Sequence, residues 1–114
     1  MPTTLVLEDN MVVATMLTAM IEKFGHAVMG PCVSEEDAQK LLVKETPTHA
    51  ILDINLGGGK TSFAVARALI DRNVTVSFSS AYTPDELPDD LAGCTFMPKP
   101  ITQDELKSFL EIPA

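Results

Sequence analysis

The sequence has few basic residues, only two cysteines and no long apolar run, and each shortage excludes a class of protein or partner. Lys and Arg total 8 residues against 16 Asp and Glu, so the formal net charge is −8 at pH 7. Nucleic-acid backbones and anionic membranes repel so acidic a chain, and no cluster of basic residues offsets the average. We therefore expect neither a nucleic acid nor a membrane as a direct partner.

The two cysteines, Cys32 and Cys94, have the spacing neither of a metal site nor of a disulfide framework. We expect them to be small buried residues in a reducing compartment. No apolar run approaches the ~18 residues of a membrane span, and the N-terminus has no signal-peptide pattern. These absences favour a cytoplasmic protein. The length of 114 residues predicts one domain over residues 1–114, with no separate output domain.

Four short apolar runs each end in a side chain that can do chemistry. Glu8 and Asp9 end the first run, Asp53 follows residues 50–52, Ser80 ends the next run and Lys99 follows the last. A short apolar run bounded by turn residues is typical of a strand buried on both faces. Open α/β sheets build their sites at the carboxyl ends of such strands.

Helical periodicity alternates with these runs. The predicted strands cover residues 3–8, 27–29, 49–53, 74–79 and 94–97. The predicted helices cover 11–24, the stretch between Ser34 and Thr46, 61–72, a short segment from Thr83 that Pro88 interrupts, and 102–111. The alternation predicts a parallel sheet with helices on both faces. We favour a flavodoxin-like (βα)5 doubly wound α/β fold with strand order 2-1-3-4-5.

This strand order places the first and third strands side by side, so Glu8 and Asp9 meet Asp53. It also places Cys32 and Cys94 at opposite edges of the sheet, too far apart for a disulfide. Three neighbouring carboxylates repel one another unless a cation intervenes, and Mg²⁺ prefers such oxygen ligands. Asp9 and Asp53 would each give one oxygen, Glu8 would act through a water, and the main-chain carbonyl of Asn55 would add another.

A carboxylate beside a bound Mg²⁺ is suited to phosphoryl transfer. Asp53 would attack in line, which makes an aspartyl phosphate. Lys99 and Ser80 would supply the cation and the hydroxyl donor for the other phosphoryl oxygens.

Two other interpretations stay open beside this one. A Mg²⁺-dependent phosphatase with an aspartyl nucleophile needs a second acid two residues later, where this chain has Asn55. A binding module that never turns over phosphate is the other alternative. Each of these residues, taken singly, also has a structural explanation as a turn, a cap or a surface charge.

Four motifs, in order along the whole chain, resemble the receiver domain of a two-component response regulator. They are Glu8-Asp9, Asp53-Ile54-Asn55, Ser80-Ala81 and Lys99-Pro100. Further details resemble a narrower group of receivers, which accompany histidine kinases of the HWE type in proteobacteria. These details are Gly30-Pro31, Asn55-Leu56-Gly57-Gly58, Ser62-Phe63 and Ser80-Ala81-Tyr82.

The resemblance implies a role for each matching residue. Asp53 would be the phosphoacceptor and Glu8 with Asp9 the acidic Mg²⁺ pair. Ser80 would be the switch hydroxyl that moves towards the phosphoryl group, and Lys99 would be the ion-pair partner of that phosphoryl group. The main-chain carbonyl of Asn55 would bind the metal, and the peptide between Lys99 and Pro100 would be cis.

Two departures from the family pattern affect output. The switch hydroxyl is Ser80 rather than the more usual Thr. The aromatic switch position is Phe96, which has no hydroxyl, so coupling there would rest on packing or pass through Tyr82.

The resemblance also implies partners. The phosphoryl group would come from a histidine kinase or a histidine phosphotransfer protein, and the domain would catalyse only its own phosphorylation and dephosphorylation. A downstream protein would bind the face made by the helix from Thr83, the strand 94–97 and the helix 102–111. The chain would activate or inhibit that partner, relay phosphate or act as a phosphate sink, as a monomer or weak homodimer.

Overall fold

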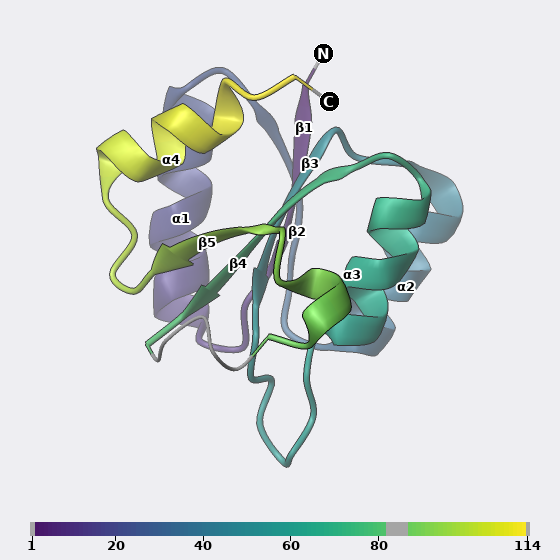
Figure 1. Ribbon diagram of the computed structural model, residues 1–114. Coiled ribbons are helices and arrows are strands. Elements are labelled where there is room, and N and C mark those ends of the chain that lie inside the picture. The colour runs from purple at the N-terminus through teal and green to yellow at the C-terminus, as the bar shows by residue number, and fades with distance from the viewer. Residues whose placement is uncertain (1, 82–86, 114) are drawn as a thin grey trace.

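A computed structural model describes residues 2–81 and 87–113, which form a five-stranded parallel sheet (Figure 1). The strands are β1 (Thr3–Leu7), β2 (Ala27–Cys32), β3 (His49–Asp53), β4 (Thr75–Ser80) and β5 (Thr95–Pro98). Their order is β2-β1-β3-β4-β5, which confirms the predicted flavodoxin-like topology. The carboxyl ends of β3 and β4 lie low in Figure 1, where the loop after β3 projects below the sheet.

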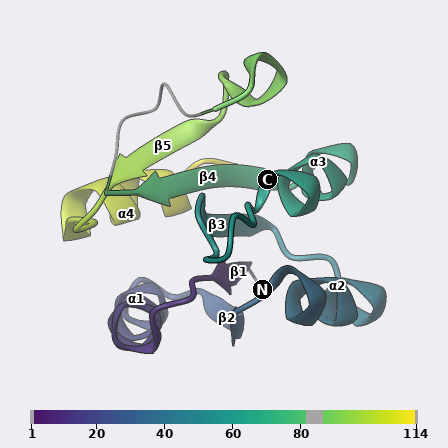
Figure 2. The same cartoon turned by 90° about the horizontal axis from the view of Figure 1, so that it is seen from below.

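Helices cover both faces of the sheet. Within the described residues they are α1 (Met11–Lys23), α2 (Glu35–Lys44), α3 (Phe63–Asp71), α4 (Gln103–Leu110) and a short 3-10 helix, η2 (Asp89–Leu91). Figures 1 and 2 show α1 and α4 on one face and α2 and α3 on the other. The helix predicted from Thr83 lies largely outside the described residues. Among the described helices, none has the length and apolar character needed to cross a membrane.

The central strand β3 is buried along its whole length, as its apolar run predicts. Its side chains alternate between two core clusters. Ala50 and Leu52 pack in the cluster that includes residues of α2 and α3, whereas Ile51 packs with residues of α1 and α4. Because a strand repeats every two residues, Asp53 continues the face of Ile51, towards α1 and α4.

Three helices begin at residues whose side chains cap the first helical turn. The Asn10 side chain accepts from the backbone N–H groups of Val12 and Val13, at 3.0 and 3.3 Å. Ser34 caps α2, and Thr102 forms a capping box with Glu105. Each side-chain oxygen satisfies a backbone donor that the first helical turn leaves without an internal partner. The caps therefore fix where the helices leave the carboxyl edge of the sheet.

Strand β2 runs to Cys32, so the prediction that it ends at Met29 is wrong. Gly30 has φ +98°, and the register between β2 and β1 shifts by one residue at this point. A Cβ on Gly30 would lie 2.6 Å from the backbone nitrogen of Cys32, so only glycine fits. The Gly-Pro signal therefore marks an irregularity inside a strand rather than its end.

Both cysteines are free, in agreement with the sequence prediction that they do not pair. Burial raises the pKa of the Cys32 thiol to about 11, and Asp37 adds to the shift. Cys32 packs in the core cluster beside α2. A thiol with so high a pKa is inert, so Cys32 acts as a small apolar core residue.

Candidate functional site at the carboxyl edge of the sheet

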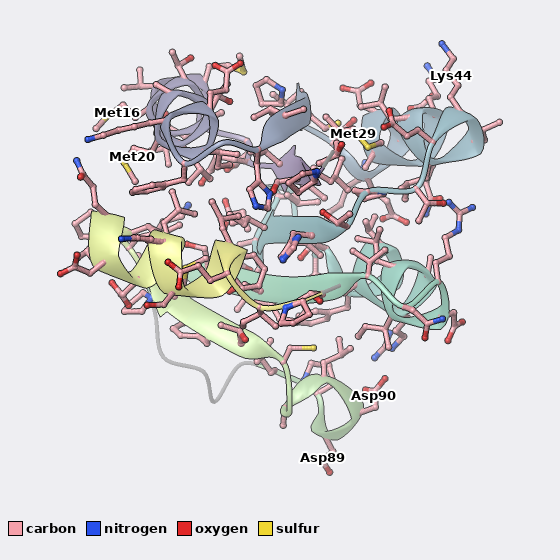
Figure 3. All side chains as sticks on the ribbon, turned by 90° about the horizontal axis from the view of Figure 1, so that it is seen from above. Met16, Met20, Met29, Lys44, Asp89 and Asp90 are labelled. Atoms are coloured by element: carbon pink, nitrogen blue, oxygen red, sulfur yellow. The ribbon has the colours of Figure 1, made fainter. Side chains whose placement is uncertain are left out.

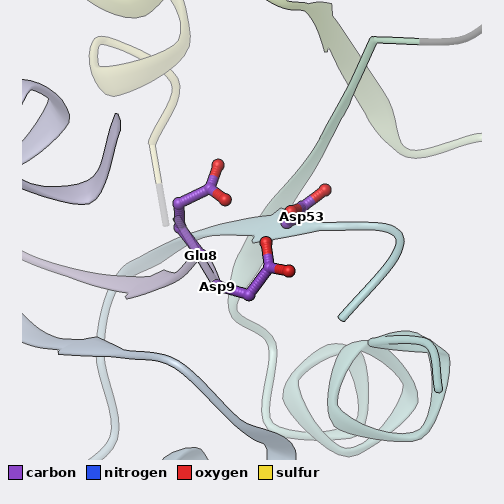
Figure 4. A group of neighbouring side chains, drawn as sticks. All are labelled: Glu8, Asp9 and Asp53. Carbon is purple, nitrogen blue, oxygen red and sulfur yellow. The ribbon is translucent and has the colours of Figure 1, made fainter. Parts of the chain in front are cut away.

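The structure brings Glu8, Asp9 and Asp53 together. Glu8 and Asp9 follow β1, and Asp53 ends β3, which pairs with β1 through Leu7 and Leu52. One carboxylate oxygen from each of the three acids lies within 4.8 Å of the others. Figure 4 shows the three side chains converging from the two neighbouring strand ends.

Lys99 lies against two of these acids. Its Nζ is 2.6 Å from Oε1 of Glu8 and 3.2 Å from Oδ2 of Asp53. The backbone N–H of Lys99 donates to the carbonyl of Ser80 at 2.9 Å, which fixes the end of β5 beside β4. The peptide between Lys99 and Pro100 is cis, as the sequence resemblance implies. One ammonium thus contacts two of the three carboxylates in the cluster.

This charge imbalance acts on Asp53. Burial raises the pKa of Asp53, hydrogen bonds with Asp9 and Glu8 raise it further, and Lys99 offsets part of the shift; the pKa is about 7. Burial lowers the pKa of Lys99, but the hydrogen bond with Glu8 and the charge of Asp53 outweigh burial and raise it. The cluster therefore favours additional positive charge, and its all-oxygen donor set fits a small divalent cation such as Mg²⁺.

Glu8 is held by backbone as well as by Lys99. Its Oε2 accepts from the backbone N–H of Asn10 at 3.1 Å, and its own N–H donates to the carbonyl of Cys32 at 2.9 Å. Glu8 is 3% exposed, whereas Asp9 is exposed to solvent. Glu8 thus has a fixed position, and a cation from solution can reach the cluster from the side of Asp9.

The loop after β3 passes beside the acids. Asn55, two residues after Asp53, is exposed and forms an isolated bridge with Thr61 at the base of the loop. The glycines at 57–59 all have positive φ, between +60° and +82°, a conformation that glycine adopts without strain. A Cβ on Gly57 would lie 3.9 Å from Oδ2 of Asp9, so the loop backbone passes close to the site.

Two of the remaining predicted residues, Ser80 and Phe96, lie on β4 and β5. Ser80 ends β4 and is 2% exposed. Phe96 pairs with Phe78 across β4 and β5 and packs, half-buried, against the core cluster that includes α2 and α3 residues. Tyr82 lies outside the described residues.

Comparisons with known proteins bear on the fold. No family model matches the sequence, and neither does any curated protein. The PhyR response regulator REC domain of Erythrobacter litoralis aligns with a TM-score of 0.83 and 22% identity, over 96% of this chain and 86% of that one. PhyR from Brucella abortus aligns with a TM-score of 0.80 and 27% identity, over 95% of this chain and 45% of that one.

A third solved structure is a response regulator from Burkholderia pseudomallei with a phosphorylated aspartic acid, a calcium ion and citrate. It aligns with a TM-score of 0.83 and 22% identity, over 97% of this chain and 67% of that one. The chain has the fold of a response regulator receiver domain.

Sequence reasoning misses two features of this site. One is the backbone N–H of Asn10, which donates to Glu8 and which no sequence motif specifies. The other is Ser79, which lies opposite Asp53 in the β3–β4 pairing. The apolar alternation of β4 gives its strand assignment, but only the register identifies Ser79 as the neighbour of Asp53.

Proposed function

We propose that this receiver domain accepts a phosphoryl group on Asp53 and signals through phosphorylation-dependent protein binding. The observation that supports the proposal most strongly is the convergence of three carboxylates within 4.8 Å, with Lys99 in contact with two of them. In a cluster of acids that is merely surface charge, there is no physical reason for one of the acids to be buried. Here Asp53 is 6% exposed and sits at the end of a fully buried strand.

The proposed reaction is a transfer from a phosphohistidine. An Asp53 oxygen forms a bond to phosphorus while the P–N bond breaks, and the electron pair of that bond stays on the imidazole, which takes up a proton. The Lys99 ammonium neutralises charge on the phosphoryl oxygens, and Ser80, one residue beyond the partner of Asp53 on β4, donates its hydroxyl to one of them.

We assign the cation site to Asp9 and Asp53, with Glu8 acting through a water and the Asn55 carbonyl as a further ligand. The chemistry of the donor set supports this assignment, because Mg²⁺ takes one or two carboxylates and keeps several waters. When bound, the cation neutralises charge on the phosphoryl oxygens. The Burkholderia pseudomallei response regulator, which shares this fold, contains both a phosphorylated aspartic acid and a calcium ion, which supports a divalent cation as a ligand.

The surface beside Lys99 supports a protein as phosphodonor. A cavity of about 310 Å³ lies between α1 and residues 99–101, and its lining is almost wholly apolar. Met16 and Met20 line it, and Figure 3 shows Met20 on the side of α1 next to α4. Val12 and Met16 are 70% and 63% exposed. We propose that a histidine kinase or histidine phosphotransfer protein contacts this surface, and that a downstream partner binds the face of β5 and α4.

Incubation with Mg²⁺ and acetyl phosphate, followed by intact mass measurement, tests the proposal. We expect one added phosphoryl group in the wild type and none in Asp53→Ala or the nearly isosteric Asp53→Asn. Steady phosphate release from many unrelated esters would instead favour the phosphatase. Neither phosphorylation nor phosphate release would favour an inert binding module.

A further inference from the structure

The Ser79 hydroxyl is buried beside the site without a hydrogen-bond partner. Ser79 is 2% exposed, and its Oγ has no partner among the residues that the structure describes. A buried hydroxyl without a partner is destabilising, because it has lost its hydrogen bonds to water. Such groups are few in native proteins, and each calls for a physical reason.

The register places Ser79 beside Asp53. The two residues are directly paired between the parallel strands β3 and β4, and Ser79 also pairs with Met97 of β5. Directly paired residues point to the same face of a sheet. Met97 belongs to the core cluster beside α1 and α4, the cluster that also contains Ile51, two residues before Asp53. Ser79 therefore shares the face of Asp53.

Comparison with Ser77 shows that burial alone does not explain why the Ser79 hydroxyl has no hydrogen-bond partner among the described residues. Ser77 is two residues earlier on the same strand, is fully buried and faces the same side. Its Oγ donates to the carbonyl of Phe78 at 3.2 Å. Of these two serines on β4, the one paired with Asp53 has a hydroxyl without a partner among the described residues.

Phosphorylation would change the ion-pair and hydrogen-bond partners of the Asp53 oxygens. In the structure, Oδ2 of Asp53 contacts the Lys99 ammonium. Once one Asp53 oxygen carries the phosphoryl group, the more highly charged phosphoryl oxygens compete for Lys99. The other Asp53 oxygen, the acyl oxygen, then keeps the proposed cation at one lone pair, and its second lone pair, which stays buried, needs a donor.

We propose that Ser79 is a positioning residue for the aspartyl phosphate and donates its hydroxyl to the acyl oxygen of Asp53. This inference rests on the proposed function. In hydrolysis, a water oxygen bonds to phosphorus, the P–O bond to Asp53 breaks and its electron pair returns to the carboxylate. The water proton leaves with inorganic phosphate or solvent. Negative charge grows on the acyl oxygen during this step, so a donor there speeds hydrolysis.

The test compares lifetimes of the aspartyl phosphate in the phosphorylated chain of residues 1–114. Wild type, Ser79→Ala, Ser79→Cys, Ser79→Thr and Ser77→Ala are phosphorylated with acetyl phosphate and Mg²⁺ and then desalted, and loss of the phosphoryl group is followed by intact mass. We expect Ser79→Ala to lengthen the lifetime roughly tenfold, the effect of one hydrogen bond to a charged group. Ser79→Cys, a weak donor of similar size, is expected to lengthen it as well.

The controls separate donation from packing. Ser79→Thr keeps the hydroxyl, and Ser77→Ala removes one that already has a partner, so both are expected to decay within about twofold of the wild type. If Ser79→Ala and Ser79→Cys decay at the wild-type rate, the inference is overturned while the proposed function stands. A wild type that never gains a phosphoryl group overturns both.

Discussion

At the scale of single residues, Asp53 combines two opposing requirements. As the proposed nucleophile it must be an anion, yet burial and the neighbouring acids raise its pKa to about 7. Lys99 compensates only part of this, because its Nζ contacts Glu8 as well as Asp53. The residue environment therefore couples cation binding to the charge of the nucleophile, and metal affinity should fall as the pH drops below about 7.

The charge state of Asp53 predicts a pH dependence of stability. Because its pKa rises from an ordinary 3.8 to about 7, the unfolded chain loses this proton at lower pH than the folded chain. Stability is thus lost as pH rises from about 4 to 7 in chelator-treated protein. We expect Asp53→Asn to exceed the wild type in unfolding free energy by at least about 1 kcal/mol at pH 8, with a smaller difference at pH 5.

Urea unfolding at a series of pH values measures this difference. Added Mg²⁺ serves as the control, because an ion that binds the folded wild type should shrink the advantage of Asp53→Asn. A difference that does not change between pH 5 and pH 8 would contradict the raised pKa.

The sequence contains enough information to place the acids but not their pairings. Strand ends and alternation are sufficient to bring Glu8, Asp9 and Asp53 to one edge, because parallel strands share their direction. Which acid faces Lys99 depends on side-chain conformations that no motif encodes. The position of Ser79 depends on register, which is a property of two strands rather than of one.

At the scale of elements, helix starts were predictable and the end of β2 was not. Caps such as Asn10 act over two or three residues, so the local sequence determines them. In β2, the dipeptide Gly30-Pro31 is a local sequence pattern typical of a turn. Pairing with β1 nevertheless carries the strand on to Cys32, because a tertiary contact overrides a local preference there.

Three glycines provide a matched test of this element-scale interpretation. Gly30→Ala combines φ +98° with a Cβ 2.6 Å from the backbone nitrogen of Cys32. Gly57→Ala has φ +82° but only an ordinary contact, and Gly93 has neither a positive φ nor a neighbour within 4 Å. In thermal or urea unfolding we expect Gly57→Ala to cost about 1 kcal/mol, Gly30→Ala clearly more, and Gly93→Ala nearly nothing. Equal losses for Gly30→Ala and Gly93→Ala would refute the assignment of the β2 irregularity.

At the scale of the whole molecule, the sheet carries a second polar cluster at the edge opposite the acids. Thr4 Oγ1 lies 3.0 Å from Nδ1 of His26, and the ring of His26 lies 5.0 Å from that of His49. Nε2 of His49 lies 2.6 Å from the carbonyl of Ile112, just after α4. The two histidines are therefore structural residues that join the sheet to the C-terminal helix, as expected for histidines beside buried strands.

This second cluster predicts an acid-side loss of stability. Burial lowers the pKa of His26 below 6.5, the charge of His49 lowers it further, and a hydrogen bond to Leu110 opposes part of the shift. A lowered histidine pKa means that the unfolded chain takes up the proton first, so stability is lost as pH falls below about 6.5.

Protonation of Asp53 stabilises the fold over the same pH range, which would mask the effect of His26. The chains with and without His26→Gln are therefore compared when both also carry Asp53→Asn. There we expect His26→Gln, which cannot ionise, to flatten the decline in unfolding free energy between pH 7 and pH 5. If the unfolding free energy falls just as steeply in His26→Gln, protonation of His26 does not cause the loss of stability at low pH.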